Sequence, residues 1–139
     1  STVMEKVEEP TNEPKEEVAL RLISNDQMKY DKSELKAPAN SIVTLTLVNE
    51  GQMPKAAMGH NFVLLKNGTD IAAFGMKAIE AGIDKDHIPN SNAIIAHTKL
   101  IGGGEETTVT FDAPAKGIYD FICSFPGHYG IMKGKFIVE

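Results

Sequence analysis

The 139-residue chain contains no tryptophan and a single cysteine, Cys123. One thiol excludes an internal disulfide, so Cys123 is free either to bind a metal or to be buried as a small hydrophobe. No apolar run approaches the roughly 20 residues that are needed to span a bilayer, and no hydrophobic signal segment is present. We therefore expect either a cytosolic protein or a mature chain that has already been processed.

Basic residues are outnumbered, with 14 Lys and Arg against 19 Asp and Glu and a net charge of −5. No basic stripe is present, so nucleic acid is not an expected partner. Residues 1–17 hold six glutamates and two lysines and have almost no apolar content. Such a segment buries too little surface to offset its ordering entropy. We predict a flexible acidic tether over residues 1–17, which is either a ragged terminus or a spacer to a membrane anchor, and a folded domain over residues 18–139.

Short alternating apolar patterns dominate the domain, which is long enough to bury a core. They predict strands from residue 18 and over residues 41–48, 60–65, 92–96, 107–111, 117–122 and 133–138. Glycine and proline clusters separate these strands. Only residues 69–81 are helical in pattern, with Thr69 or Asp70 as N-cap and Gly82 as the stop. Seven or eight strands with one short helical insertion predict an all-β Greek-key β-sandwich.

The most informative motif follows the cysteine, at the spacing Cys-x4-His-x3-Met: Cys123, His128 and Met132. A thiolate, an imidazole and a weak thioether together suit copper, because the set accepts both Cu(I) and Cu(II). Cys123 ends a predicted strand, and Pro126-Gly127 forms a turn that brings the donors back toward one point. A loop held by strands at both ends is well suited to fixing ligand geometry.

A blue-copper site also needs a second histidine, and the Gly59-His60 pair at the start of a predicted strand offers one. Each of these residues alone is a weak signal, because a lone cysteine, histidine or methionine is more often a core or surface residue. Their joint occurrence at this spacing favours a single-copper electron carrier.

Several segments resemble the azurin family of bacterial blue-copper (cupredoxin) proteins. FICSFPGHYGIMKGKFIV resembles the family's ligand loop and last strand, MGHNFVLL its first-histidine motif, and IAHTKLIGGGEETTVTF its connecting segment. The likeness spans roughly residues 22–139. It implies one copper ion held by His60, Cys123 and His128, with Met132 as a long axial ligand and the Gly59 carbonyl opposite it.

The resemblance also implies roles for two neighbours of the ligands. Asn61 would brace the ligand loop through its amide, and the Phe125 backbone N–H would donate to the Cys123 sulfur. Such outer contacts fix ligand orientation and tune the reduction potential.

By the same resemblance, His128 should expose its outer ring edge inside an apolar docking patch, which comprises Met28, Met53, Ala57, Met58, Met76, Pro126, Gly127 and Ile131 and is bordered by Phe125. Methionines suit a surface that meets several partners, and small uncharged interfaces release quickly. The implied partners are transient redox proteins such as a c-type cytochrome or a copper or haem reductase. The implied protein is a monomer in the periplasm or tethered to the cell surface. We predict that His87 and His97 are ordinary surface or near-surface histidines.

Three alternatives remain at this stage. Copper storage or delivery would use the same ligands but favours an open, exchangeable site. An enzyme with Cys123 and His128 as a nucleophile–base pair lacks a third orienting carboxylate and an oxyanion-hole loop. A structural zinc site would need four firm ligands, and a thioether is a poor one.

Overall fold

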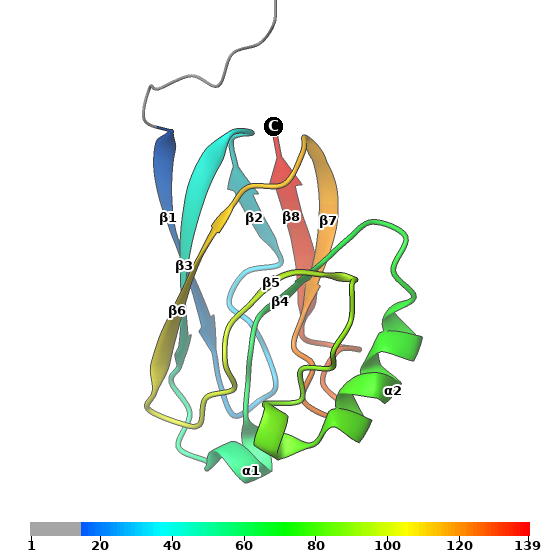
Figure 1. The fold of residues 1–139 in the computed structure, drawn as a ribbon. Helices are drawn as coiled ribbons and strands as arrows, with labels where there is room; N and C mark the ends of the chain where they lie inside the picture. Colours follow the sequence, from blue (N-terminus) through cyan, green and yellow to red (C-terminus); the bar gives the residue numbers. More distant parts are fainter. Residues whose placement is uncertain (1–14) are drawn as a thin grey trace, which may run out of the picture.

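Within residues 15–139, which the computed structural model describes, eight strands form two sheets. The sheets face one another as the two layers of a sandwich (Figure 1). This arrangement confirms the predicted all-β sandwich of seven to eight strands with one short helical insertion. Residues 1–14, which make up most of the predicted tether, lie outside the described part of the chain.

The smaller sheet has the order β1-β3-β6. Its strands are β1 (Glu16–Ser24), β3 (Ser41–Asn49) and β6 (Glu106–Asp112), with β1 parallel and β6 antiparallel to β3. β1 begins two residues before the predicted strand, inside the segment that we expected to be tether. The reason is pairing: Glu16 and Glu17 lie opposite Ser41 and Ile42 of β3, which extends the ladder beyond the apolar residues.

The larger sheet has the order β2-β8-β7-β4-β5. Its strands are β2 (Glu34–Ala37), β8 (Lys133–Val138), β7 (Gly117–Ile122), β4 (Val63–Leu65) and β5 (Ile94–His97). β7 and β8 have the predicted bounds. β4 is shorter than predicted, because His60 makes only an isolated bridge with Ile101. β2 was not predicted.

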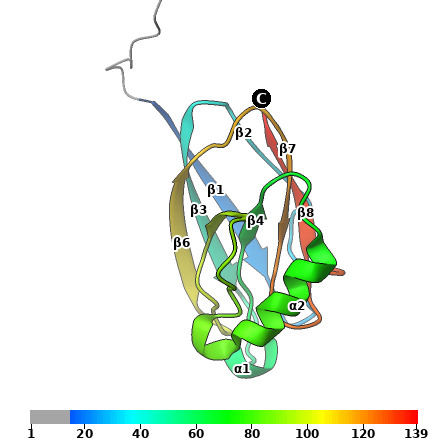
Figure 2. The same ribbon diagram turned by 45° about the vertical axis from the view of Figure 1, so that its right-hand side comes forward.

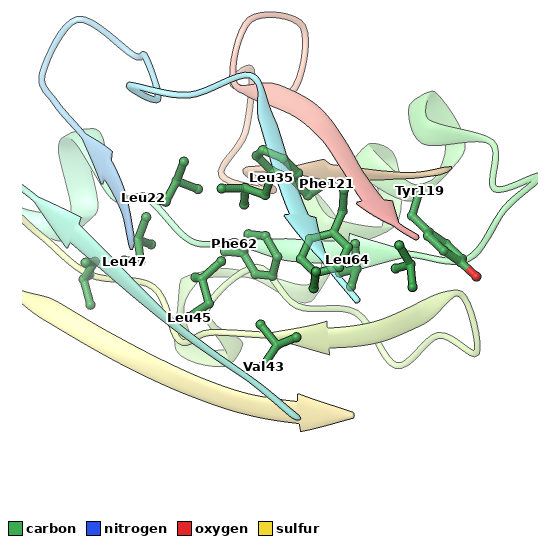
Figure 3. Close-up of a cluster of buried hydrophobic side chains, with 13 residues drawn as sticks. Leu22, Leu35, Val43, Leu45, Leu47, Phe62, Leu64, Tyr119 and Phe121 are labelled. Carbon is green, nitrogen blue, oxygen red and sulfur yellow. The ribbon is translucent and has the colours of Figure 1, made fainter. Parts of the chain in front are cut away.

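The core fills the space between the sheets (Figure 3). Alternate β3 residues Val43, Leu45 and Leu47 point inward, as the period-2 pattern requires. On the larger sheet Phe121 and Leu64 belong to the same cluster. Their strand neighbours Val63, Leu65 and Ile122 face the other way, into a second cluster with Phe74.

That second cluster lies beneath helix α2 (Ile71–Ala81), which covers the outer face of β4 and β7 (Figure 2). Asp70 caps α2 by accepting from the Ala73 N–H at 3.0 Å, and Gly82 follows its last residue, as predicted. A short helix α1 (Lys55–Met58) and a 3₁₀ turn η1 (Ile83–Lys85) were not predicted. Among the described residues, no helix is both long and apolar enough to cross a membrane.

The segments that carry the candidate ligands lie at one end of the sandwich. β7 ends at Ile122 and β8 begins at Lys133, so residues 123–132 form the loop between them, called the ligand loop below. α1 and α2 lie at this end, whereas the C-terminus lies at the other (Figure 1). The backbones of His60 and Ile101 exchange hydrogen bonds of 2.9 and 3.0 Å, which hold His60 at this end ahead of β4.

Candidate metal centre

Three potential metal ligands from two distant parts of the sequence meet at this end. One ligand atom each from His60, Cys123 and His128 lies within 4.8 Å of the others, and all three residues are buried. Cys123 Sγ lies 3.9 Å from His60 Nδ1 and 3.5 Å from His128 Nδ1. The sequence therefore identified residues that the fold brings together.

These distances match a metal site. Protein ligands bind a first-row metal such as zinc at roughly 2.3 Å from sulfur and about 2.05 Å from nitrogen. Placed around one ion at angles between tetrahedral and trigonal, such a sulfur and nitrogen lie about 3.6–3.8 Å apart. The observed separations bracket this range. The donor set of one thiol and two imidazoles, with a buried thioether nearby in sequence, fits copper.

The ligand loop is closed by its own backbone. The Cys123 N–H donates to the Met132 carbonyl at 3.0 Å, which continues the β7–β8 ladder into the loop. The Met132 N–H donates to the His128 carbonyl at 2.8 Å, and the His128 N–H donates to the Phe125 carbonyl at 3.0 Å. These bonds form two consecutive turns, so the backbone itself ties Cys123, His128 and Met132 together.

The orientation of His60 is set from a different loop. Its Nε2 lies 2.7 Å from the Asn25 carbonyl oxygen, which can only accept a hydrogen bond. Nε2 therefore carries the proton, and the lone pair of Nδ1 faces Cys123 Sγ. The Asn25 carbonyl thus selects the tautomer that a metal ligand needs.

His128 is more enclosed than we predicted. Only 2% of the residue is exposed, so the expected open outer edge is limited to a small opening. The Phe125 ring covers it, with the ring centroids 4.5 Å apart at an interplanar angle of 32°. The His60 ring lies on another side at 5.1 Å.

Burial determines the protonation of all three groups. It raises the pKa of the Cys123 thiol to about 12, although the backbone N–H groups of Asn61 and Phe125 act in the opposite direction. Burial, together with the charges of the other histidines, lowers the pKa of His128 to about 4. The pKa of His60 is also lowered by burial, partly offset by its bond to Asn25 and by the Asp26 charge. The metal-free site at neutral pH thus holds one thiol and two neutral imidazoles.

Asn61 joins the two halves of the site. Its Oδ1 accepts from the Ser124 N–H at 2.8 Å, and its Nδ2 donates to Ser124 Oγ at 2.9 Å and to the Asp86 carbonyl at 3.2 Å. The Tyr30 hydroxyl donates to the Asn61 carbonyl at 2.5 Å. The three partner residues, Tyr30, Asp86 and Ser124, come from three different segments, so Asn61 fixes the ligand loop against the strand that follows His60.

The other residues expected at the site differ in how far they are exposed. Gly59 is buried, with its carbonyl oxygen 4.0 Å from Cys123 Sγ, and Met132 is fully buried. Of the predicted docking patch, Met53, Ala57, Met76, Gly127 and Ile131 are exposed, and Met28, Met58 and Pro126 are half-buried.

The two remaining histidines differ from one another. His97 is exposed on β5, as predicted. His87 is buried, with 8% of its surface exposed, which corrects the prediction of an ordinary surface or near-surface histidine. It is enclosed because its ring meets Phe125 and its Nδ1 bonds the Ala78 carbonyl at 3.0 Å.

Five contributors were not predicted from the sequence: Asn25, Tyr30, Asp86, His87 and Ser124. Asn25 acts through its backbone carbonyl, which every residue type possesses, so the sequence carries no signal for it. The position of Ser124 beside Cys123 could have indicated a polar contact, because a hydroxyl next to a buried thiol needs a partner.

Known proteins show clear similarity to this chain. The sequence matches the family described as copper binding proteins, plastocyanin/azurin family, over residues 16–139. Azurin from Pseudomonas chlororaphis is 42% identical over 121 residues, which cover 84% of this chain and 94% of that protein. Outer membrane protein H.8 from Neisseria gonorrhoeae is 43% identical over 117 residues, which cover 81% of this chain and 62% of that protein.

A solved structure agrees with the sequence relatives. Auracyanin A, a "blue" copper protein from the green thermophilic photosynthetic bacterium Chloroflexus aurantiacus, is 34% identical, with a TM-score of 0.82. The match covers 88% of this chain and 99% of that structure. With the family matched across the whole sandwich and the three potential ligands meeting at its end, the chain belongs to the plastocyanin/azurin family of copper-binding proteins.

Proposed function

We propose that this protein carries single electrons on one copper ion bound by His60, Cys123 and His128. The observation that carries the proposal is the preassembled, buried group of one thiol and two imidazoles. Such a set holds copper in both oxidation states. Similarity to azurins and to a blue copper auracyanin supports the same function. The protein is an electron carrier rather than an enzyme.

The full ligand set that we propose adds the Met132 thioether and the Gly59 carbonyl, which would hold the ion more weakly than the thiolate and the two imidazoles. Met132 is fully buried and closes the loop that carries Cys123 and His128. The Gly59 oxygen faces the same sulfur. A weak thioether suits a copper site better than a zinc site, because zinc prefers four firm ligands.

The chain's own residues contribute orientation and exclusion of water. Asn25 fixes the His60 tautomer, Asn61 and Ser124 fix the loop, and Phe125 covers His128. Copper supplies the change of oxidation state. These hydrogen bonds and packing contacts are made by the protein itself, so they would hold the ligands in one arrangement in both oxidation states and limit their rearrangement on electron transfer.

Visible absorption after addition of Cu(II) tests this proposal. We expect an intense blue absorption that disappears on reduction and is absent from Cys123→Ser. A protein that binds Cu(II) stoichiometrically but stays colourless would contradict the proposal and favour copper handling. Slow exchange of copper to a chelator, together with fast electron self-exchange, would argue further against delivery of copper to other proteins.

Members of this family exchange electrons with other proteins, and we propose that the docking patch named above receives the partner. Its exposed members Met53 and Ile131 flank the site end of the sandwich, and Met76 lies on α2. A c-type cytochrome or a reductase fits an uncharged patch of this kind.

Two isoleucines of equal exposure provide a matched test of docking. Ile131 in the ligand loop is 61% exposed, and Ile118 near the start of β7 is 59% exposed at the opposite end (Figure 1). We expect Ile131→Lys to slow electron transfer to a c-type cytochrome about tenfold, the effect of losing one central apolar contact. Ile118→Lys should leave the rate unchanged. Equal rates for the two variants would contradict docking at the ligand loop.

We further propose that the protein works as a monomer in the periplasm or at the cell surface. The likeness to bacterial azurins, and to a protein named as an outer membrane protein, supports this location. Fractionation of cells that carry the tagged full-length gene tests it, and recovery in the cytoplasm would contradict it.

A further inference from the structure

The segment that follows α2 forms an unusual turn against the ligand loop. After η1, Asp86 and His87 both have left-handed backbones, with φ of 58° and 54°. This conformation is unfavourable for residues other than glycine, although Asp and His are among those that adopt it most often. Consecutive residues in this region persist only where their surroundings hold them.

Both carbonyl groups of this turn are used by the metal centre. The Asp86 carbonyl accepts from Asn61 Nδ2 at 3.2 Å, and the His87 carbonyl accepts from Ser124 Oγ at 2.8 Å. Ser124 directly follows Cys123 in the chain. The left-handed turn therefore directs two carbonyl oxygens toward Asn61 and Ser124, the residues that fix the position of Cys123.

The His87 side chain anchors the turn to α2. Its Nδ1 lies 3.0 Å from the Ala78 carbonyl, which can only accept, so Nδ1 donates. Ala78 is in the last turn of α2, where carbonyl groups lack helical partners. The Gly82 N–H, which would normally bond Ala78, bonds the Ile79 carbonyl at 3.2 Å instead. The His87 Nδ1–H thus donates to the Ala78 carbonyl in place of the missing backbone N–H.

The other edge of the same ring supports Phe125. The two ring centroids lie 5.4 Å apart at 75°, an edge-to-face contact. Phe125 in turn covers His128 at 4.5 Å. A continuous series of contacts therefore runs from α2 through His87 and Phe125 to His128.

We propose that His87 is a positioning residue for the metal centre, acting through its ring on Phe125 and through its carbonyl on Ser124. This inference rests on the copper site proposed above. His87 does not contact the metal position; it restrains the two loop residues that adjoin Cys123 and cover His128. Outer contacts of this kind commonly change metal affinity by roughly 10–100-fold. Since His87 acts through one intervening residue, we expect the lower end, about tenfold.

Two substitutions test the role. His87→Ala removes both the donor to Ala78 and the ring. His87→Asn keeps a side-chain donor and tolerates the left-handed backbone, so it removes mainly the ring contact with Phe125. His97→Ala is the matched control, because His97 is exposed on β5 and its Nδ1 bonds only the neighbouring Thr98 carbonyl, at 2.9 Å.

Three measurements on each full-length variant are needed: Cu(II) affinity by competition with a chelator, the absorption and EPR signature of the Cu(II) form, and the His128 ring resonances of the metal-free protein by NMR. We expect both His87 variants to bind Cu(II) about tenfold more weakly, with altered signatures and shifted His128 resonances. His97→Ala should match the wild type in all three. The Cu(II) affinity, the spectroscopic signature and the His128 resonances would stay unchanged if His87 only stabilised the fold.

The inference is overturned if His87→Asn keeps the wild-type affinity and signature, whatever its melting temperature. It is also overturned if His97→Ala changes them equally. A colourless wild-type protein at full copper occupancy would instead refute the proposed function, so the two failures are distinguishable.

Discussion

Helix α2 contains a glycine, Gly75, where the ligand loop presses against it. A β-carbon built on Gly75 would lie 2.6 Å from Cε2 and 3.0 Å from Cδ2 of the Tyr129 ring. Tyr129 directly follows His128 and packs into the cluster under α2. Glycine inside a helix is ordinarily unfavourable, so we infer that it is present to admit this ring.

The effect of Gly75→Ala can be worked out from two opposing contributions. Alanine is favoured over glycine in a helix interior by about 1 kcal/mol. Against this, overpacking a well-packed site costs about 1–3 kcal/mol, because carbon atoms prefer separations of roughly 3.5–4.0 Å. The steric cost is the larger, so we expect a net loss of about 1 kcal/mol in the free energy of unfolding.

Urea unfolding of the metal-free protein, followed by far-UV circular dichroism, measures this change. In a Tyr129→Leu background the ring is gone, so the same Gly75→Ala substitution should stabilise by about 1 kcal/mol. Gly130→Ala in the ligand loop is the control, since its β-carbon would meet nothing within 4 Å. If Gly75→Ala stabilises the protein equally in both backgrounds, the Tyr129 ring moves at no cost and the reasoning is wrong.

Three further predictions concern the ligands' surroundings. Asn61→Leu should lower stability by about 3 kcal/mol, because it leaves the buried Ser124 N–H unpaired, and should weaken Cu(II) binding roughly 10–100-fold in a chelator competition. Gly59→Ala should weaken Cu(II) binding as well, since its β-carbon would lie 2.6 Å from the Lys55 carbonyl and 2.9 Å from Leu100, and His60 would have to shift; an unchanged affinity would contradict this. The metal-free protein should be most stable between about pH 6.5 and 9, measured by urea unfolding across pH. The pKa of His128 is about 4 in the folded protein, so as the pH falls below this window the unfolded chain takes up a proton at His128 first and stability falls. The pKa of Cys123 is about 12 in the folded protein, so as the pH rises above the window the unfolded chain loses the Cys123 proton first and stability falls again. A Cys123→Ser variant that kept the alkaline loss unchanged would show that another group causes it.

The sequence predicts the strands whose apolar residues alternate and are bounded by turn residues, as in β7 and β8. It misses β2, which has only four residues and is held by parallel pairing with β8, a partner about a hundred positions away in the chain. The polar start of β1 is missed for the same reason, because Glu16 and Glu17 gain their strand conformation from β3. In each case pairing with a strand far away in the chain decides the structure. The four residues of β2 do alternate between exposed and buried, but so short a pattern does not predict a strand on its own.

The residues of the site are likewise only partly predictable from the sequence. Cys123, His128 and Met132 can be recognised because they share one short loop, with donor types that suit copper and a spacing that resembles the family's ligand loop. The groups that orient the ligands and their neighbours are largely backbone carbonyls: that of Asn25 bonds His60, that of Asp86 bonds Asn61 and that of His87 bonds Ser124. Since a carbonyl is common to all residues, side-chain identity cannot reveal which one will face a ligand; only the fold does.

Neutral donors explain how the three ligand atoms can lie within 4.8 Å of one another in a buried site. Two protonated histidines and a thiolate within 4.8 Å would place three charges in a buried pocket, at a large desolvation cost. Burial instead holds the thiol protonated and the imidazoles neutral, which leaves three uncharged groups that pack at 3.5–3.9 Å without repulsion. The proton on Cys123 is released only when a cation takes its place. Copper affinity should therefore rise about tenfold for each pH unit through the neutral range, until the ion itself hydrolyses. The hydrogen bonds that orient these donors, such as that of His60 Nε2 to the Asn25 carbonyl, use atoms other than those that would hold the cation, so the same bonds would orient the ligands.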